Sequence, residues 1–238
     1  MVKVNIVQKD GFLFEELVEI IKILRSPEGC PWDREQTHKS IRNEFVEETY
    51  EAVDAIDRED DTDLCEELGD VLLQILLHCQ IASENNAYSI DDVINGIAKK
   101  MILRHPHVFG DVVAETTDKV LENWDNIKRD EKHQTSFTDT LKSVPMSYPS
   151  LMRAAKVQKR AAKAGVTMPD KDKLLSDAEN CINSLKAGND NSFETIGELL
   201  FTLCALMRVL KIDGEETLNK KTDKFIADFE KSEKLGFI

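Results

Sequence analysis

Apolar residues recur at intervals of three and four along most of this chain, and that spacing constrains the fold more than any other feature. One stripe is formed by Phe14, Leu17, Val18, Ile21 and Leu24. This spacing gathers apolar side chains on one face of an α-helix, whereas a half-buried strand requires strict alternation. The 238 residues include only ten glycines and six prolines, which is few for a fold with many β-turns. The sequence therefore predicts an all-α protein.

Helix boundaries in the front part follow from the same periodicity and from the residues that interrupt it. Helices are predicted over 12–25, 39–58, 62–84, 89–105 and 117–132. Proline and glycine between 26 and 31 end the first helix. Ser89 is a suitable N-cap for the fourth helix, and Pro106 ends it because the residue before proline disfavours helical backbone.

The rest of the chain predicts a second module. Segment 133–150 has two prolines and no sustained apolar stripe, so it is interpreted as a linker between a module at 1–132 and another at 151–238. A basic helix at 151–164 and three further helices are expected there. Ile196-Gly197-Glu198 is similar to Leu68-Gly69-Asp70, which hints at a tandem repeat.

Charge and cysteine content exclude several classes of function. The formal net charge of −14 repels nucleic-acid backbones and anionic membranes, so neither is expected as a partner. The five cysteines contain no C-x-x-C pair, which argues against a disulfide framework or a zinc site. The first residues lack the apolar stretch of a signal peptide, and no apolar run is long enough for a membrane span. A cytoplasmic protein is expected.

Two successive helices of the front part each carry a row of acidic residues. The rows consist of Glu44, Glu47, Glu48 and Glu51, and of Asp63, Glu66, Glu67 and Asp70. A tight turn at 58–61 makes the helices antiparallel neighbours, so the two acidic edges are expected to face one groove. Converging carboxylates repel one another, and Mg²⁺ or Mn²⁺ removes that repulsion. The alternative is that these edges are solvated faces, an interpretation favoured for Asp63 and Glu66.

A smaller basic cluster stands out in this acidic chain. Lys100 and Arg104 lie four residues apart and share one helix face, where an arginine can bind phosphate oxygens in a forked geometry. Trp124 and Lys128 follow on the next helix, and an aromatic ring beside a cation suits a phosphorylated base. The alternative is that Trp124 anchors the core and Lys128 is solvated.

Several of these motifs occur in the order found in one known family. Glu47-Glu48-Thr49-Tyr50-Glu51, followed by Glu67-Leu68-Gly69-Asp70, resembles the E-E-x-x-E and E-x-x-D signature of MazG nucleoside triphosphate pyrophosphohydrolases. The segments at 29–37, 104–109 and 124–128 are similar too, and 151–160 looks like the start of that family's second module. The resemblance spans nearly the whole chain.

The resemblance implies tandem all-α helical-bundle modules, a homodimer, and Mg²⁺-dependent hydrolysis of nucleoside triphosphates to nucleoside monophosphate and pyrophosphate. Such an activity serves to cleanse nucleotide pools. By analogy, the metal ligands are Glu48, Glu51, Glu67 and Asp70. Glu47 would either lie just outside the direct metal ligands or accept a proton. Lys100 and Arg104 would contact phosphates, and Trp124 and Lys128 would lie near the nucleotide. Water would attack the α-phosphorus, and pyrophosphate would leave toward Lys100 and Arg104.

The second half departs from the family's pattern. It carries Ser176-Asp177-Ala178-Glu179-Asn180 where the glutamate signature is expected, and Thr195-Ile196-Gly197-Glu198 where E-x-x-D is expected. A catalytically silent, degenerate module is therefore predicted at 151–238, with a role in packing, dimerisation or regulation. This departure also leaves two other functions open: a non-catalytic nucleotide- or metal-binding adaptor of the same fold, and a purely structural helical dimer.

Overall fold

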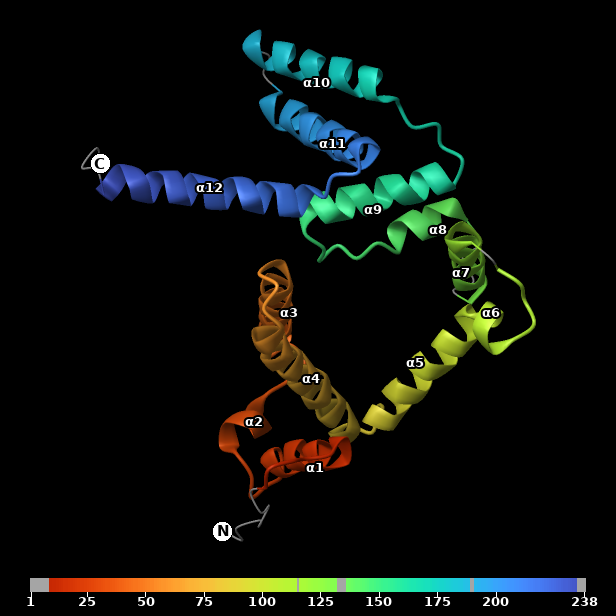
Figure 1. Cartoon of the computed structure of the whole chain (residues 1–238), viewed down its shortest axis with the longest axis vertical. Coiled ribbons are helices and arrows are strands. Elements are labelled where there is room, and N and C mark those ends of the chain that lie inside the picture. The colour runs from red at the N-terminus through yellow and green to blue at the C-terminus, as the bar shows by residue number, and fades with distance from the viewer. Residues whose placement is uncertain (1–8, 115, 132–135, 189–190, 235–238) are drawn as a thin grey trace. The chain divides into compact units, whose positions relative to one another are not determined.

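The computed structural model describes residues 9–114, 116–131, 136–188 and 191–234, and these form twelve α-helices and no β-strand (Figure 1). The predicted all-α class is confirmed. The chain divides into two compact units, Met1–Trp124 and Asp125–Ile238. Among the described helices, none combines the length and apolar character that a membrane span requires.

The helices of the first unit agree with the predicted ones to within a few residues. They are α1 (Phe14–Leu24), α2 (Pro31–Glu35), α3 (Arg42–Asp57), α4 (Asp61–Glu84), α5 (Ile90–Arg104) and α6 (Pro106–Phe109), and α7 (Thr117–Glu131) crosses into the second unit. Ser89 caps α5 as predicted, because its hydroxyl accepts a hydrogen bond from the Asp92 amide while the Asp92 carboxylate accepts one from the Ser89 amide. The short helices α2 and α6 were not predicted.

An antiparallel hairpin of α3 and α4 forms the centre of the first unit. Its turn contains Glu59, whose φ of +56° reverses the chain direction. The Asp60 carboxylate then caps α4 by accepting hydrogen bonds from the amides of Thr62 and Asp63, both at 3.1 Å. This tight connection holds the first turns of α4 beside the last turns of α3.

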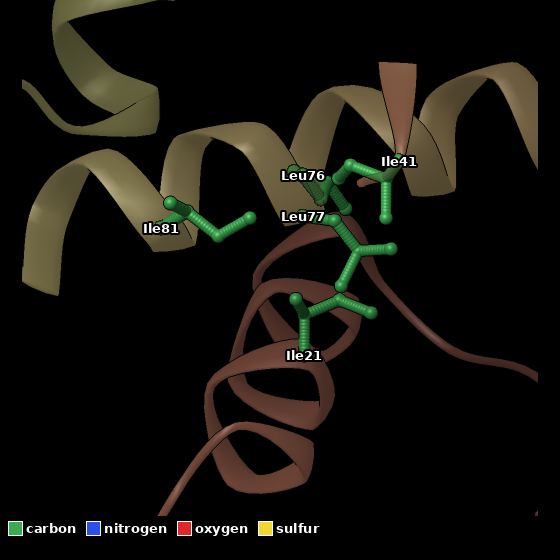
Figure 2. Close-up of a cluster of buried hydrophobic side chains, with 5 residues drawn as sticks. All are labelled: Ile21, Ile41, Leu76, Leu77 and Ile81. Carbon is green, nitrogen blue, oxygen red and sulfur yellow. The ribbon is translucent and has the colours of Figure 1, made fainter. Parts of the chain in front are cut away.

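The core of the first unit lies where α1 and the chain before α3 meet α4. Ile21 of α1 and Ile41 are almost fully buried against Leu76, Leu77 and Ile81 of α4, and Figure 2 shows these five side chains converging. Each buried apolar side chain of this size contributes about 1.5–3 kcal/mol to folding.

Parts of the apolar stripes on α3 and α4 lie outside this core. Ile41 and Ala52 are buried as the periodicity predicts, but Phe45, Ile56 and Leu68 are 37%, 56% and 54% exposed. Periodicity identifies the apolar face of a helix, but it does not say whether the same chain supplies the surface that covers it.

The connection from α1 to α3 is held by a buried arginine. Arg25, at the end of α1, forms a two-pronged ion pair with Glu84 at the end of α4, through Nε (2.9 Å) and Nη2 (2.7 Å). Its Nη1 also donates hydrogen bonds to the carbonyls of Asp33 and Gln36. Gly29 packs so tightly that a Cβ there would lie 2.2 Å from the Ile23 carbonyl oxygen. This loop is therefore fixed on α1 and α4.

The second unit contains α8 (Phe137–Lys142), α9 (Ser150–Lys163), α10 (Lys171–Lys186), α11 (Ser192–Leu210) and α12 (Gly214–Lys234). The helices α10 and α11 pair along their lengths, and α9 packs on α8, α11 and α12. The side chain of Gln158 on α9 donates to the Phe201 carbonyl of α11 at 2.8 Å. Helix α8 lies within the segment predicted as a linker. Arg160 of α9 donates to the Thr140 carbonyl and to the Ser143 hydroxyl.

Candidate active site

Three carboxylates from the two acidic rows converge where α3 passes α4. One oxygen from each of Glu48, Glu67 and Asp70 lies within 4.8 Å of the others, and all three side chains are half-buried. Glu48 belongs to α3, whereas Glu67 and Asp70 lie one turn apart on α4. The hairpin therefore brings both halves of the acidic pattern to one place.

The pKa values of two of these carboxyl groups are raised by partial burial and by neighbouring negative charges. Partial burial raises the pKa of Glu48, and the charges of Asp70, Glu51 and Glu47 raise it further. Partial burial likewise raises the pKa of Glu67, and the charges of Glu51, Asp63, Asp70 and Glu48 add to that effect. Glu51 therefore lies close enough to act on carboxylates of both helices. The exposed Glu47 acts on the cluster through Glu48.

The main causes of both pKa shifts are burial and neighbouring carboxylates, and no basic side chain is among them. In addition, the Glu67 Oε2 atom is buried and has no hydrogen-bond partner among the described residues. An unpaired, buried carboxylate oxygen is unfavourable unless a cation compensates it. Hard carboxylate oxygens at this spacing suit Mg²⁺ or Mn²⁺, so the residues present fit a divalent cation.

The polar seam of the hairpin continues beyond these carboxylates. Glu44 Oε2 and Gln74 Oε1 are also buried without a partner in the described part of the chain, and Gln74 is only 6% exposed. In an antiparallel hairpin, Glu44 lies one turn from Glu48 along α3, and Gln74 lies one turn from Asp70 along α4. Helix spacing puts Gln74 on the same edge of α4 as Asp70, but nothing in the sequence indicates that Glu44 and Gln74 have buried side-chain oxygens.

A pair of histidines lies further along the same seam. The Nδ1 atoms of His38 and His78 are 2.8 Å apart, the two rings stack, and the Phe45 ring meets His78 edge-on. Burial lowers the pKa of His78, and the charge of His38 lowers it further. These contacts make His78 a packed histidine at the edge of the core. Nothing in the sequence indicated His38 as its partner.

The predicted basic cluster forms a separate arrangement at the end of α5. Arg104 is 6% exposed, and its guanidinium lies 5.3 Å from the centre of the Trp124 ring, within range of a cation–π interaction. His105 meets the same ring edge-on, and its Nδ1 lies 2.6 Å from the Met101 carbonyl oxygen. Lys100 lies one turn before Arg104 and is half-buried. The Trp124 ring therefore lies against Arg104 and His105 at the end of α5.

The structure therefore brings the predicted site residues together in two groups. The first consists of Glu48, Glu67 and Asp70, with Glu51 and Glu47 beside them. The second consists of Lys100, Arg104 and Trp124. Lys128 lies one turn beyond Trp124 on α7, already within the second unit.

Comparison with known proteins identifies relatives whose sequences align with most of this chain. Residues 36–109, which include both acidic rows, match the model of the MazG nucleotide pyrophosphohydrolase domain. The chain is 42% identical over 227 residues to the nucleoside triphosphate pyrophosphohydrolase/pyrophosphatase MazG of Thermotoga maritima, an alignment that covers 94% of this chain and 87% of the relative.

Two further relatives support the same comparison. The chain is 39% identical over 229 residues to the nucleoside triphosphate pyrophosphohydrolase of Escherichia coli K12, which covers 93% of this chain and 87% of that protein. It is also 43% identical over 218 residues to the uncharacterized protein YabN of Bacillus subtilis, of which the alignment covers 44%.

Proposed function

This chain belongs to the MazG nucleotide pyrophosphohydrolase family, and we propose that its first unit hydrolyses nucleoside triphosphates to nucleoside monophosphate and pyrophosphate at the acidic groove of α3 and α4. The observation that carries this proposal is the convergence of the Glu48, Glu67 and Asp70 carboxylates within 4.8 Å. Among the described residues, no basic side chain is a main cause of the pKa shifts of Glu48 or Glu67. The identity to two pyrophosphohydrolases over most of the chain supports it.

The acidic groove is the proposed site of Mg²⁺, with Mn²⁺ as a substitute. Glu48, Glu51, Glu67 and Asp70 would hold the metal, which would neutralise charge on the triphosphate and lower the pKa of water. The buried, unpaired Oε2 of Glu67 supports this role, because it lacks any protein donor in the described residues. Glu47 is exposed beside Glu48, and it accepts the proton released by the attacking water.

The α5 cluster is the proposed site of the phosphates and the nucleoside. Lys100 and Arg104 offset the negative charge that develops on the leaving pyrophosphate. Trp124 holds the Arg104 guanidinium against its ring, so the same contact presents an aromatic surface and a fixed cation. Lys128 is one turn from Trp124 and adds positive charge near the nucleotide. Cleansing of nucleotide pools in the cytoplasm is the proposed role of the reaction.

A homodimer is the proposed assembly. The apolar side chains that α3 and α5 leave at least 39% exposed include Val46, Tyr50, Val53, Val93, Ile94, Ile97, Ile102 and Leu103. Monomeric proteins seldom expose such continuous apolar faces, and a second copy would remove them from water.

The module at 151–238 is proposed to be catalytically silent, with segment 133–150 connecting it to a catalytic module at 1–132. In the described part of the chain, the group of Glu48, Glu67 and Asp70 is the one acidic cluster with metal-binding spacing. The departures of residues 176–180 and 195–198 from the family signature support the same conclusion.

A product assay tests the proposed function. The full chain is incubated with Mg²⁺ and a panel of ribonucleoside and deoxyribonucleoside triphosphates, and the products are separated by ion-exchange chromatography. Equal amounts of nucleoside monophosphate and pyrophosphate are expected. Release of orthophosphate and nucleoside diphosphate would contradict the proposed bond cleavage. Saturable binding with no product after long incubation would identify an adaptor instead, and absence of both would leave a structural dimer.

A further inference from the structure

The second unit contains a pocket of about 380 Å³ that is remote in sequence from the acidic groove. It is bounded by the first turn of α9, the last turns of α11 and the first turn of α12. This volume falls within the range of small-molecule sites, which begins at about 300 Å³. The residues of this pocket are used neither by the proposed reaction nor by the family's acidic signature.

Four cations line this pocket, namely Lys156, Lys159, Arg208 and Lys211. None of them has an ion-pair partner among the residues that the structure describes, and the Nε of Arg208 is buried without any hydrogen-bond partner. Leaving a buried guanidinium donor unpaired is unfavourable, so the site is incomplete without an acceptor. Uncompensated cations are notable in a protein with a net charge of −14.

The two carboxylates at the pocket are already engaged by the backbone. Asp213 caps the start of α12, where it accepts a hydrogen bond from the Glu216 amide at 3.0 Å. Glu215 accepts one from the Met152 amide of α9 at 3.2 Å. Four cations against two carboxylates leave an excess of two positive charges. The N-terminal ends of α9 and α12 both lie at the pocket and add to its positive potential.

One of the cations occupies a strained position. Lys211 follows the last turn of α11 with φ +58° and ψ +40°, a left-handed conformation that glycine usually supplies at this place. A left-handed backbone conformation is unfavourable for a residue with a Cβ, because the Cβ approaches the following carbonyl oxygen. Retaining a lysine there is understandable if its charge has a use, because strained residues cluster at binding sites.

Apolar side chains also line the pocket. Leu151 and Met207 are among them, and Met207 packs so closely on Gly214 that a Cβ there would lie 2.9 Å from the methionine methyl group. A lining that combines cations with apolar side chains suits a ligand with an anionic end and an apolar body.

We propose that this pocket binds a phosphorylated small organic molecule, with the phosphate at Lys156, Lys159, Arg208 and Lys211 and the organic part on Leu151 and Met207. A phosphate monoester carries close to two negative charges, which matches the excess charge of the site. The proposal is independent of the reaction in the first unit.

The test uses the full chain with its methionine methyl groups labelled with ¹³C, in EDTA and low salt. AMP and inorganic pyrophosphate serve as separate probes and are titrated while methyl signals are followed by NMR. The signals of Met152 and Met207 at the pocket are expected to shift, whereas Met168, which does not line it, serves as reference. AMP is expected to bind more tightly than pyrophosphate because only AMP has an organic part that can contact the apolar side chains of the lining.

Two variants connect these shifts to the pocket. The double substitution Lys156→Ala, Lys159→Ala is expected to weaken AMP binding about tenfold, the usual effect of losing a charge-assisted hydrogen bond. Lys211→Gly is expected to weaken binding severalfold while the melting temperature stays unchanged or rises, because glycine relieves the left-handed strain. Lys186→Ala on α10 removes one charge outside the pocket and is the matched control.

Several results would overturn the proposal. The first is that the Met152 and Met207 signals stay unchanged at about 10 mM AMP, a concentration that would reveal even weak binding. The second is that AMP and pyrophosphate bind with equal affinity. The third is that the Lys186→Ala control loses as much affinity as the pocket variants. Hydrolysis by the first unit, assayed separately with Mg²⁺, does not enter these outcomes.

Discussion

At the residue scale, the carboxylates of the acidic groove lower the stability of the folded chain, because they repel one another. The charges on Glu48, Glu67 and Asp70 are brought within 4.8 Å and partly withdrawn from water. The raised pKa values of Glu48 and Glu67 show that the folded state disfavours their charged forms. Such clusters of like charge occur mainly at functional sites, where a bound ligand compensates the repulsion.

Replacing one of these carboxylates by its neutral counterpart should therefore separate stability from metal binding. In EDTA, Glu67→Gln is expected to melt at a higher temperature than the unmodified chain, because one repelling charge is gone. Mg²⁺ at about 100 times its dissociation constant should stabilise the unmodified chain by about 2.7 kcal/mol, and the variant by much less. Thermal unfolding with and without Mg²⁺ measures both effects.

Glu66→Gln is the control for this comparison. Glu66 lies next to Glu67 on α4 but is exposed and outside the carboxylate cluster. Its substitution should leave the response to Mg²⁺ intact. An equal Mg²⁺ response in Glu67→Gln and in the unmodified chain would remove Glu67 from the metal site.

The His38–His78 pair predicts a dependence of stability on pH. Its 2.8 Å contact requires one ring to donate and the other to accept, so it is lost when both rings are protonated. The pKa of His78 is lowered in the folded state, first by burial and then by His38. Its contribution to stability is therefore present above the ordinary histidine pKa near 6.5 and is lost as the pH falls through the lower, folded-state value.

Denaturant unfolding at pH 7.5 and at pH 5.5, on the order of one unit either side of that ordinary value, tests this expectation. The free energy of unfolding should fall between these pH values, and His38→Ala should reduce the fall because the repelling partner is absent. His107→Gln on α6 removes a histidine outside the pair and should keep the fall. A dependence on pH that is identical in His38→Ala and the unmodified chain would show that this pair is not its source.

Sequence reasoning found the charged residues of the site but not their buried neighbours. Glu48, Glu67 and Asp70 were predicted to meet because helix periodicity and a short turn determine which edges face each other. The burial of Gln74 depends on how α3 and α4 pack, which side-chain spacing within one helix does not define. The contact of His38 with His78 joins residues forty positions apart, and only the folded hairpin reveals it.

At the scale of elements, Arg25 fastens the end of α1 to the end of α4. Its side chain is 4% exposed, and it satisfies Glu84 and two loop carbonyls at once. The same interaction lowers the pKa of Glu84. Arg58 at the turn of the hairpin pairs with three carboxylates, those of Asp54, Asp60 and Asp63, but its side chain is 49% exposed.

These two arginines should differ sharply in their contribution to stability. Arg25→Ala is expected to lower the free energy of unfolding by about 2–4 kcal/mol, because it leaves buried acceptors without donors. Arg58→Ala is expected to lower it by at most about 1 kcal/mol, since solvent competes for exposed ion pairs. Urea unfolding of both variants makes the comparison. Similar losses in the two variants would contradict the account of Arg25 as a buried clamp.

Long helices were predictable at this scale, and short ones were not. The caps of α4 and α5 involve Asp60 and Ser89, whose side chains satisfy the free amides of the first turn. Pro31 and Pro106 were interpreted only as breaks, yet each begins a short helix, because proline suits the first helical position. Helices of four to six residues are too short to show apolar periodicity.

At the scale of the whole molecule, each unit has its own proposed task. The first unit contains the acidic groove, and the second contains the cationic pocket. Each unit has one closely packed helix pair, α3 with α4 in the first and α10 with α11 in the second.

The proposed homodimer predicts that a charge on the exposed apolar face of α5 will disrupt it. Ile97 is 48% exposed in the single chain. Burying an isoleucine contributes about 1.5–3 kcal/mol, and burying an unpaired carboxylate opposes association further. Ile97→Glu is therefore expected to weaken the dimer by at least about 100-fold. Light scattering after size-exclusion chromatography measures the mass of the species.

Asn95→Glu places the same charge on α5 at a polar position and is expected to remain dimeric. An unmodified chain that is monomeric at micromolar concentration would contradict the dimer itself. Helix periodicity marks apolar stripes on α3 and α4, but it does not say what covers them. Phe45 and Leu68 belong to these stripes and are still exposed in the single chain.

The most direct test of the account compares pyrophosphate release by Asp70→Asn and by Glu66→Gln in the presence of Mg²⁺. Both substitutions remove one negative charge from α4, but only Asp70 belongs to the carboxylate cluster. Asp70→Asn is expected to lower the turnover rate by about 100-fold or more, equivalent to about 2.7 kcal/mol, while Glu66→Gln stays near the unmodified rate. Undiminished pyrophosphate release by a folded Asp70→Asn protein would contradict the assignment of hydrolysis to this groove.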